Sequence, residues 1–363
     1  MTTFCWTISA RELMAAQAVI RLCQALCIIS LALSVTACGN DSSKARLTEF
    51  DGDTQGTTYH IKVVDLPATL SPETVKTAIE AELDDITRHL STYTPDSELS
   101  RFNRSRDTGW VPASAGLVQV LSEARQISEL SQGVYDVTVG PLVNLWGFGP
   151  EDTGERIPSE AEIAAALARI GYTHLSIRPS PPAIRKDIPE LTVDVSSIAQ
   201  GYTVDRVAER LESLGIANYL AEIGGELRGK GLNQLGGHWR IGIERPTPGE
   251  RSVYTIIRIA DVGVSTSGDY RDYFEHDGQR YSHTINPQTG RPVSHRLASV
   301  TVVSENTMRA DALSTALMVL GPEEGYHLAE QTGIAAYFIV NSDAGFTDRE
   351  TTAFDRHRLK DKR

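Results

Sequence analysis

The four cysteines of this 363-residue chain all lie within its first 38 residues, at Cys5, Cys23, Cys27 and Cys38. The rest of the chain therefore has no thiol for a disulfide, for a covalent nucleophile or for a metal site. We expect oxygen side chains to hold any bound metal ion.

The same N-terminal region has the pattern of an export signal. Arg11 and Arg21 precede an apolar run at 27–33, and the small residues of 35–37 come directly before Cys38. The run is shorter than the roughly 18 to 20 apolar residues that span a bilayer, and small residues beside a cysteine suit the peptidase that matures lipoproteins. We predict a lipoprotein signal peptide at 1–37, a lipidated Cys38 and a flexible tether at 38–47. The alternative is an ordinary cleaved signal with an incidental cysteine.

The remainder of the chain has the composition of a globular protein. We assign 48–350 to one integrated domain and 351–363 to a basic tail, which we expect to be solvated. The formal net charge is −12, which argues against nucleic acid as a ligand because nucleic-acid binding needs a broad basic surface. An anionic small ligand would need positive charge placed locally.

Hydrophobic spacing predicts the fold class. Apolar residues recur every three or four positions after Ser71-Pro72, before Gly133 and before Gly215, which predicts three amphipathic helices. Strand-like runs lie at 58–64, 191–195, 254–259, 298–303 and 335–340. Because helices and strands are interspersed irregularly, we predict an α+β fold: a single integrated, two-lobed body with mixed sheets and flanking helices. The turn-rich spans 147–158 and 178–189 are interpreted as surface excursions.

A helical pattern at 309–321, with Gly321 as its expected end, carries oxygen side chains at Asp311, Ser314 and Thr315. Their neighbours are Ala, Leu, Met and Val, so burial would remove them from water. Magnesium prefers a carboxylate, neutral oxygens and substrate phosphates in octahedral geometry, which one Asp with two hydroxyls fits. In the structural alternative, Ser314 and Thr315 bond back to helix carbonyls while Asp311 faces solvent.

Three further segments offer groups for binding or proton transfer. The segment 191–205 predicts a strand, a small-residue turn and a helix start whose N–H groups can meet a phosphate, although a simple capped helix fits as well. The pair Gly224-Gly225 allows either a close approach to a ligand or a tight turn. His283 lies in the hydroxyl-rich segment 281–292 and is the candidate general base, with a structural histidine as the alternative.

Five ordered motifs together resemble the FAD:protein FMN transferase family, the periplasmic flavin transferases once labelled thiamine biosynthesis lipoproteins. The motifs are Ser91-Thr92-Tyr93, Ser97–Asn103, Tyr135–Leu142, Ile223–Glu226 and Thr266–Tyr270. The resemblance implies that Asp311 and Thr315, with Ser314, bind Mg²⁺ together with an oxygen of Ser197. It also places FAD against Gln55, Tyr93, Val134, Tyr135, Asp136, Asp194, Gln200 and Ile285, with Tyr93 as an aromatic surface for a ring of FAD.

Four positions depart from the family pattern. Gln55 stands where methionine is usual, Ser196-Ser197 where small glycines are frequent, Gln200 where lysine is frequent, and Asn286 where aspartate is common. These departures concern the expected contacts with FAD more than the expected metal ligands Asp311 and Thr315.

The resemblance implies an enzyme that transfers the FMN half of FAD to a Ser or Thr hydroxyl of an acceptor protein, with release of AMP. His283 would take the hydroxyl proton, and Asp311 would act through the metal. The implied acceptors are flavoprotein subunits of membrane redox complexes, so lipidated Cys38 would hold the enzyme on the periplasmic side of the cell membrane, with the inner membrane favoured. Two alternatives stay open: an Mg²⁺-dependent FAD pyrophosphatase that gives FMN and AMP, and a non-catalytic FAD-binding lipoprotein.

Overall fold

The computed structural model describes residues 45–149, 156–247, 249, 252–269 and 273–359. They belong to one compact unit, Ala45–Arg363. The predicted signal peptide, Cys38 and most of the tether lie outside the described residues, as do 360–363 of the predicted tail. Among the helices that the structure describes, none is long and apolar enough to cross a membrane.

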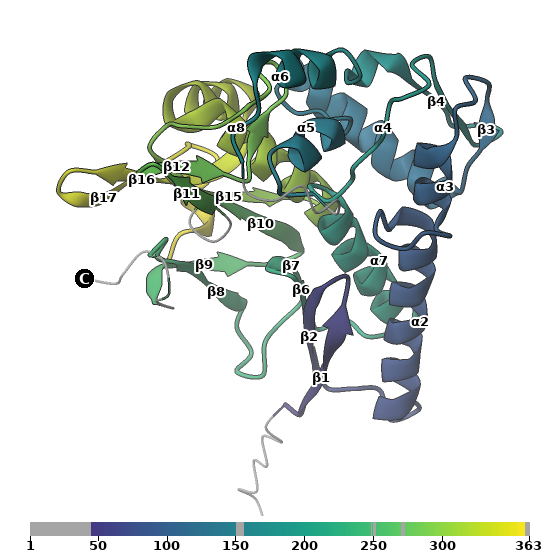
Figure 1. Cartoon of the computed structure of the whole chain (residues 1–363). Helices are drawn as coiled ribbons and strands as arrows, with labels where there is room; N and C mark the ends of the chain where they lie inside the picture. Colours follow the sequence, from purple (N-terminus) through teal and green to yellow (C-terminus); the bar gives the residue numbers. More distant parts are fainter. Residues whose placement is uncertain (1–44, 150–155, 248, 250–251, 270–272, 360–363) are drawn as a thin grey trace, which may run out of the picture. The chain divides into compact units, whose positions relative to one another are not determined.

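The largest sheet has eight strands (Figure 1). In spatial order they are β1 (Leu47–Thr54), β2 (Thr57–Val64), β6 (Tyr219–Ile223), β7 (Glu226–Lys230), β10 (Val262–Gly268), β15 (Leu297–Ser304), β16 (Ala335–Ser342) and β17 (Gly345–Glu350). Each of its ladders is antiparallel, a more regular arrangement than the mixed sheets expected from the sequence. The predicted α+β class is confirmed, because the large sheet is antiparallel and helices do not alternate regularly with its strands along the chain.

The α-helices are α2 (Pro72–Leu90), α3 (Glu98–Arg104), α4 (Ala115–Leu130), α5 (Gly140–Leu145), α6 (Glu160–Leu167), α7 (Ala199–Ser213) and α8 (Thr307–Thr332). The three helices predicted from spacing are confirmed as α2, α4 and α7. Ser71 caps α2, because its hydroxyl accepts from the Thr74 N–H at 3.1 Å. Gly133 and Gly215 follow α4 and α7 in the left-handed region, which favours glycine.

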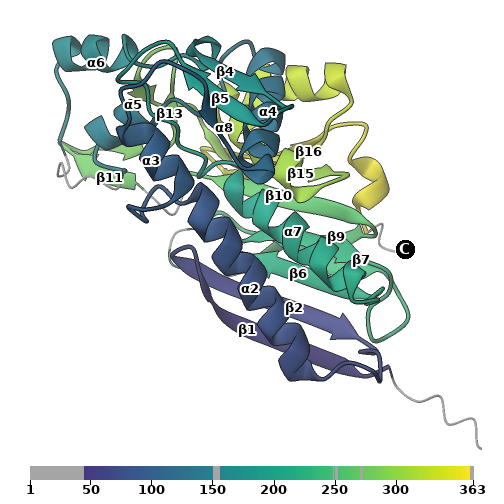
Figure 2. The ribbon, with the colours of Figure 1, turned by 90° about the vertical axis from the view of Figure 1, so that its right-hand side faces the viewer.

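Different layers cover the two faces of the eight-stranded sheet. Alternate side chains of a strand point to opposite faces; accordingly, Ala336 and Phe338 of β16 pack in the core with α4 and α8, while Tyr337 and Ile339 pack in a second core with Trp239. The face of the sheet that packs against α4 and α8 is here called the helical face. Helices α2 and α7 cover the same face over β1, β2 and β6 (Figure 2). The opposite face carries the hairpin of β8 (Trp239–Glu244) and β9 (Val253–Ile259).

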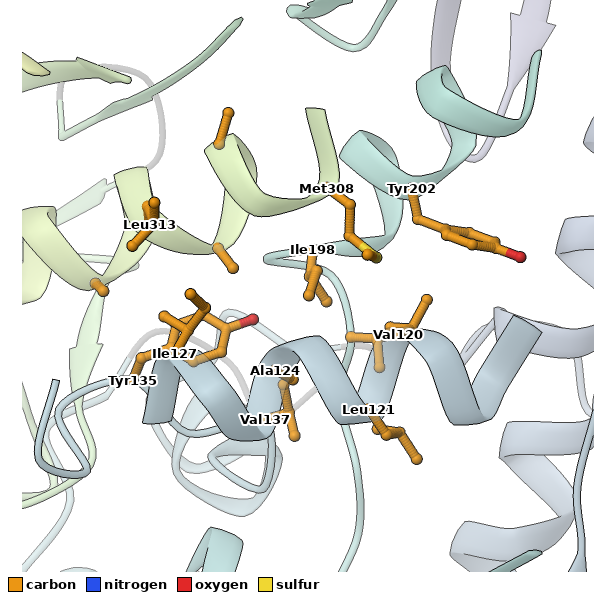
Figure 3. Close-up of a cluster of buried hydrophobic side chains, with 14 of the residues drawn as sticks. Val120, Leu121, Ala124, Ile127, Tyr135, Val137, Ile198, Tyr202, Met308 and Leu313 are labelled. Carbon is orange, nitrogen blue, oxygen red and sulfur yellow. The ribbon is translucent and has the colours of Figure 1, made fainter. Parts of the chain in front are cut away.

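The helical core packs α4 against the start of α8. Figure 3 shows Ile127 and the Tyr135 ring on the side of α4 toward α8, which carries Leu313, and Ile198 between the two helices. These side chains are buried. The core therefore fixes the backbone around Tyr135, Ile198 and Leu313, and polar residues next to each of them reach the candidate site.

Four smaller sheets complete the described structure. They are β3 (Val111–Pro112) with β5 (Ala183–Lys186) and β4 (Leu175–Arg178); β8 with β9; β11 (Tyr273–His276) with β12 (Gln279–Ser282); and β13 (Ile285–Asn286) with β14 (Arg291–Pro292). Short 3₁₀ turns lie at Tyr172–His174 and Asp355–His357. The prediction of 178–189 as a surface excursion is confirmed for the exposed turn at 179–182 and wrong for β5, which buries Ala183, Ile184 and Lys186.

The strand predicted at 191–195 is also wrong. Leu191, Val193 and Val195 are buried, but the segment joins no sheet. The Asn103 side chain binds both backbone groups of Val193 at 2.8 Å, and the Asp194 N–H donates to the Val137 carbonyl at 2.7 Å. The apolar alternation thus reflects packing between two irregular segments, which a strand pattern does not distinguish from a sheet.

Two chain ends differ from expectation. Leu47 begins β1, so the sheet starts one residue before the predicted domain boundary. In the tail that we expected to be solvated, Phe354 is fully buried and stacks on Tyr337 with ring centroids 5.3 Å apart. Its aromatic surface anchors a segment that is otherwise charged.

The predicted end of a helix at Gly321 is only an interruption. Gly321 does interrupt α8, at φ 84°, but Pro322 at once begins a further helical stretch.

Lys186 offers a test of how β5 holds the irregular segment that begins at Leu191. Its ammonium is fully buried and donates to the carbonyls of Leu191 (2.8 Å), Phe102 (3.3 Å) and Asn103 (3.5 Å), and burial lowers the pKa of Lys186. We expect Lys186→Met to lower the free energy of unfolding by about 2 kcal/mol, because buried carbonyls lose a charged donor. Urea denaturation measures the change. Lys230→Met, which breaks a half-exposed ion pair with Glu212, should cost less than about 1 kcal/mol. Equal effects of the two variants would contradict this role of Lys186.

Candidate active site

Helices α7 and α8 cap each other. Asp205 of α7 accepts from the N–H groups of Thr307 (3.0 Å) and Met308 (2.8 Å) at the start of α8, and Asp311 of α8 accepts from the Gly201 N–H (2.9 Å) at the start of α7. Free N–H groups at a helix start favour such carboxylates. A Cβ on Gly201 would lie 2.4 Å from the Thr307 carbonyl oxygen, so glycine permits this approach. The two helices thereby hold the Asp311 carboxylate in one place.

Asp311 is buried close to the carboxyl groups of Asp205 and Glu226. Asp311 is 5% exposed, which rules out the alternative in which it faces solvent. Burial raises the pKa of Asp311 to about 7, and the nearby Asp205 carboxylate adds to the rise. Burial, with the negative charge of Asp311, also raises the pKa of Glu226 well above its usual value. Glu226 Oε2 has no hydrogen-bond partner among the described residues. Two crowded acids of this kind favour a cation.

Hydroxyl groups lie beneath this acidic pair. Ser314 donates to the Asp311 carbonyl at 2.9 Å, as the structural alternative expects, and its oxygen also lies 2.9 Å from Ser267 Oγ and 3.2 Å from Ser265 Oγ. Thr315 Oγ1 lies 3.5 Å from Ser267 Oγ. Ser314 is fully buried and does not line the cavity. It supports Asp311 and Ser267 from behind.

A cavity of about 540 Å³ opens over Asp311. It gathers ten of the residues named from the sequence: Tyr93, Val134, Tyr135, Asp136, Asp194, Ser197, His283, Ile285, Asp311 and Thr315. They come from segments widely separated in the chain. Ligand cavities of this size accept small organic molecules.

Two other residues named from the sequence lie elsewhere. Gln55 is exposed, has a left-handed φ of 50° and donates its side-chain amide to Thr203 Oγ1 at 2.9 Å. Gln200 lies against Gly224 and lines a second cavity, on the other side of β10. Both are positions where the chain departs from the family pattern.

The residues at 135–137 and 194–197 are fixed against one another. Ser197 donates to the Tyr135 hydroxyl at 3.0 Å, and burial raises the pKa of Tyr135, which stays a neutral phenol. Asp136 accepts from the N–H groups of Thr138 and Tyr172, each at 2.8 Å, while burial raises its pKa. This part of the cavity is therefore preorganised by hydrogen bonds.

His283 lies between β12 and β13 at the cavity wall. Its ring meets Phe148 edge to face with centroids 6.3 Å apart. Phe148 in turn stacks on Phe274, which stacks on Tyr281. This aromatic packing places the imidazole at the cavity wall.

The charge of the cavity bears on what it can hold. Its described lining includes Asp136, Asp194 and Asp311 but no Lys or Arg. A pyrophosphate would meet repulsion there unless a cation came with it. Asp311, Thr315 and Ser197 present hard oxygen atoms, which fit Mg²⁺. No group of three His, Cys, Asp or Glu that could hold a metal occurs in the described part of the chain.

Sequence reasoning did not assign several residues around the site. Glu226 was noted only as the end of a glycine motif, and Ser267 only as part of a hydroxyl-rich run. For the serines, the alternation of side chains along a strand could have been used. Ser265 and Ser267 alternate with Val264 and Thr266 along β10, which puts both serines on the helical face. Phe148 and Met318 line the cavity as apolar residues, and nothing local in the sequence separates them from ordinary core.

Comparison with known proteins identifies the family. Residues 55–338 match the model of the ApbE family. An FAD:protein FMN transferase of Vibrio cholerae is 47% identical over 310 residues, covering 85% of this chain and 92% of that protein. An FAD:protein FMN transferase of Haemophilus influenzae is 42% identical and covers 93% of this chain and 98% of its own length.

Solved structures of the same family have a similar fold. The flavin transferase ApbE from Vibrio cholerae superposes with a TM-score of 0.80 at 46% identity, over 86% of this chain and 99% of that one. The apo form of the flavinyl transferase ApbE from Pseudomonas stutzeri gives a TM-score of 0.80 at 45% identity, over 87% of this chain and 98% of its own. The resemblance drawn from the five motifs is confirmed, and the chain belongs to the ApbE family.

Proposed function

We propose that this chain is an FAD:protein FMN transferase that moves the FMN half of FAD to a Ser or Thr hydroxyl of an acceptor protein. One observation carries the proposal: a single cavity combines an apolar lining, a buried acidic corner at Asp311 and a histidine at its wall. The flavin ring suits the apolar part around Val134, Phe148 and Ile285, and Tyr93, 72% exposed, offers an aromatic surface. The names of the relatives support the same activity.

The acidic corner suits Mg²⁺ as the partner of the pyrophosphate. Asp311, Thr315 and Ser197 would hold the ion, with Ser314 behind them. When bound, Mg²⁺ would neutralise charge on the phosphates and on the departing AMP. Asp311 is held for this purpose by the Gly201 N–H, and Ser197 by Tyr135.

The transfer itself needs one proton acceptor. The acceptor hydroxyl oxygen attacks the phosphorus of the FMN half, a new P–O bond forms, and the P–O bond to AMP breaks. The proton of that hydroxyl passes to His283 Nδ1 or Nε2, and AMP leaves with the electron pair of the broken bond. The acceptor thus ends as a phosphoester of FMN, and we infer that flavoprotein subunits of membrane redox complexes mature in this way.

Mass spectrometry tests the function. Residues 39–363, which contain the whole compact unit, are incubated with FAD, Mg²⁺ and an acceptor domain that carries a Thr, and AMP and free FMN are quantified. A covalent FMN adduct with one AMP per adduct is expected. Release of FMN and AMP without an adduct would instead establish the pyrophosphatase, and bound, unchanged FAD would establish a carrier.

Removal of the metal should stop the reaction. We expect EDTA to abolish adduct formation and excess Mg²⁺ to restore it, because the cavity lining supplies no cationic side chain among the described residues. Thermal denaturation gives a second readout: FAD with Mg²⁺ should raise Tm more than either alone. Undiminished transfer in EDTA would contradict the metal model.

We also propose that lipidated Cys38 anchors the enzyme on the periplasmic face of the inner membrane. The support is the spacing of basic, apolar and small residues before Cys38, which lies outside the described residues. In cells, the full chain should partition into detergent and carry a lipid mass at Cys38, and Cys38→Ser should release it to the aqueous phase. A membrane-bound Cys38→Ser protein would overturn the anchor.

A further inference from the structure

Strand β10 separates two cavities. Ser267 lines the candidate active site on the helical face, while Val264, Thr266 and Gly268 line a second cavity of about 810 Å³ on the opposite face. This second cavity, here called the groove, has the face of the large sheet as its floor, including Thr58, His60, Glu222, Thr266 and Thr301. The groove therefore lies on the other face of β10 from the cavity proposed for the flavin, and of the residues that the resemblance placed against FAD only Gln200 lines it.

The groove meets the active site at His283, which lines both cavities. A hydroxyl that arrives along the groove would reach the proposed base without passing the apolar part of the FAD cavity. This geometry separates the entry of the acceptor from the entry of FAD.

One wall of the groove is the open edge of β8. All five residues from Arg240 to Glu244 line it. Alternate side chains point to opposite faces of a strand, so five consecutive lining residues mean that the backbone edge itself faces the groove. Among the described strands, β8 pairs only with β9.

The register shows which backbone groups point into the groove. The Ile256 carbonyl of β9 accepts from the Leu359 N–H, so its backbone groups point away from β8. Gly242 lies opposite Ile256, and Arg240 opposite Arg258. In an antiparallel ladder the two members of such a pair both point outward. The N–H and C=O groups of Arg240 and Gly242 therefore face the groove, while the other edge of β9 is covered by the chain near Arg358.

We propose that the groove binds the acceptor polypeptide as an extended segment, which adds a strand to the open edge of β8 and directs its Ser or Thr hydroxyl to His283. Strand addition draws affinity from main-chain hydrogen bonds, and the groove carries both Arg240 and carboxylates, so no single charge on the segment is required. The glycine turn Gly224-Gly225, exposed at the groove, leaves room for a second backbone. The inference rests on the proposed transferase activity.

Proline at Arg240 tests the backbone contact. Arg240→Pro removes an N–H that faces the groove and leaves the β8 bonds to β9 in place, because those come from the neighbouring residues. We expect KM for the acceptor to rise about tenfold, with kcat and the Kd for FAD little changed. Arg240→Ala keeps the N–H and should raise KM much less. Equal KM values for Arg240→Pro and the wild type would overturn strand addition.

Cross-linking tests the groove without disturbing β8. Residues 39–363 contain no cysteine, so Thr58→Cys at the groove and Ser213→Cys at the exposed end of α7 can each carry one photoactivated label. The acceptor domain should cross-link at position 58 and not at 213, and unlabelled acceptor should compete. Labelling at neither position or equally at both, while the wild type still forms FMN adducts, would refute the groove and leave the transferase standing. A wild type that forms no adduct would refute both.

Discussion

Replacement of Asp311 by alanine is expected to reduce FMN transfer by on the order of a thousandfold, the scale of losing a preorganised electrostatic group. Asp311 supplies the carboxylate that lines the cavity beside Thr315 and Ser197, and no described Lys or Arg in that lining can replace the cation it would hold. The rate of adduct formation measures the loss. Isothermal titration should show in parallel that Mg²⁺ no longer strengthens the binding of FAD.

A matched variant separates charge from structure. Asp311→Asn keeps an oxygen that can accept from the Gly201 N–H, so the cap of α7 survives while the negative charge is lost. We expect Asp311→Asn to unfold at nearly the wild-type temperature and to transfer FMN almost as poorly as Asp311→Ala. If Asp311→Asn kept wild-type activity, the carboxylate would have only a capping role.

The elements predicted from the sequence are those with a local cause. Val75, Ile79 and Leu83 recur at helical spacing and all pack into one core, so the pattern of α2 could be read without knowing its partner. The strands β15 and β16 could likewise be predicted from their runs of apolar residues, without knowing what they pack against. Residues 191–195 show the limit, because burial against irregular chain around Asn103 gives the same apolar alternation as a sheet.

The candidate site depends on contacts that no local pattern contains. Asp311 and Thr315 share a helix face, so spacing alone could place them together. The approach of Gly201 to Thr307, which brings α7 to α8, is a tertiary contact with no signature beyond a glycine in a helix. The resemblance to the family supplied Tyr135 and Asp194, because a family pattern records positions brought together by folding, whereas His283 was named from its own hydroxyl-rich segment. Gln55 and Gln200 do not line the same cavity, and both are residues that differ from the family pattern.

Replacement of His283 by alanine is expected to slow transfer by roughly a hundredfold to ten-thousandfold, the range for a positioned proton acceptor. Binding of FAD should change little, because the apolar and acidic parts of the cavity remain. Single-turnover formation of the FMN adduct, with FAD bound in advance, isolates the chemical step from binding. His327→Ala, on an exposed part of α8, is the matched control and should transfer at the wild-type rate.

Chemical rescue decides between a base and a structural histidine at this position. His283→Ala leaves a space next to Phe148 at the point where the active site meets the groove, so free imidazole can enter and accept the proton. We expect imidazole to restore part of the single-turnover rate in His283→Ala and to leave the His327→Ala rate unchanged. A structural role predicts the reverse: FAD binding and transfer would fall by similar factors, Tm would drop, and imidazole would restore neither. Because the groove inference also directs the acceptor hydroxyl to His283, rescue together with an unaltered KM for the acceptor would show that His283 acts on the proton and does not itself hold the segment.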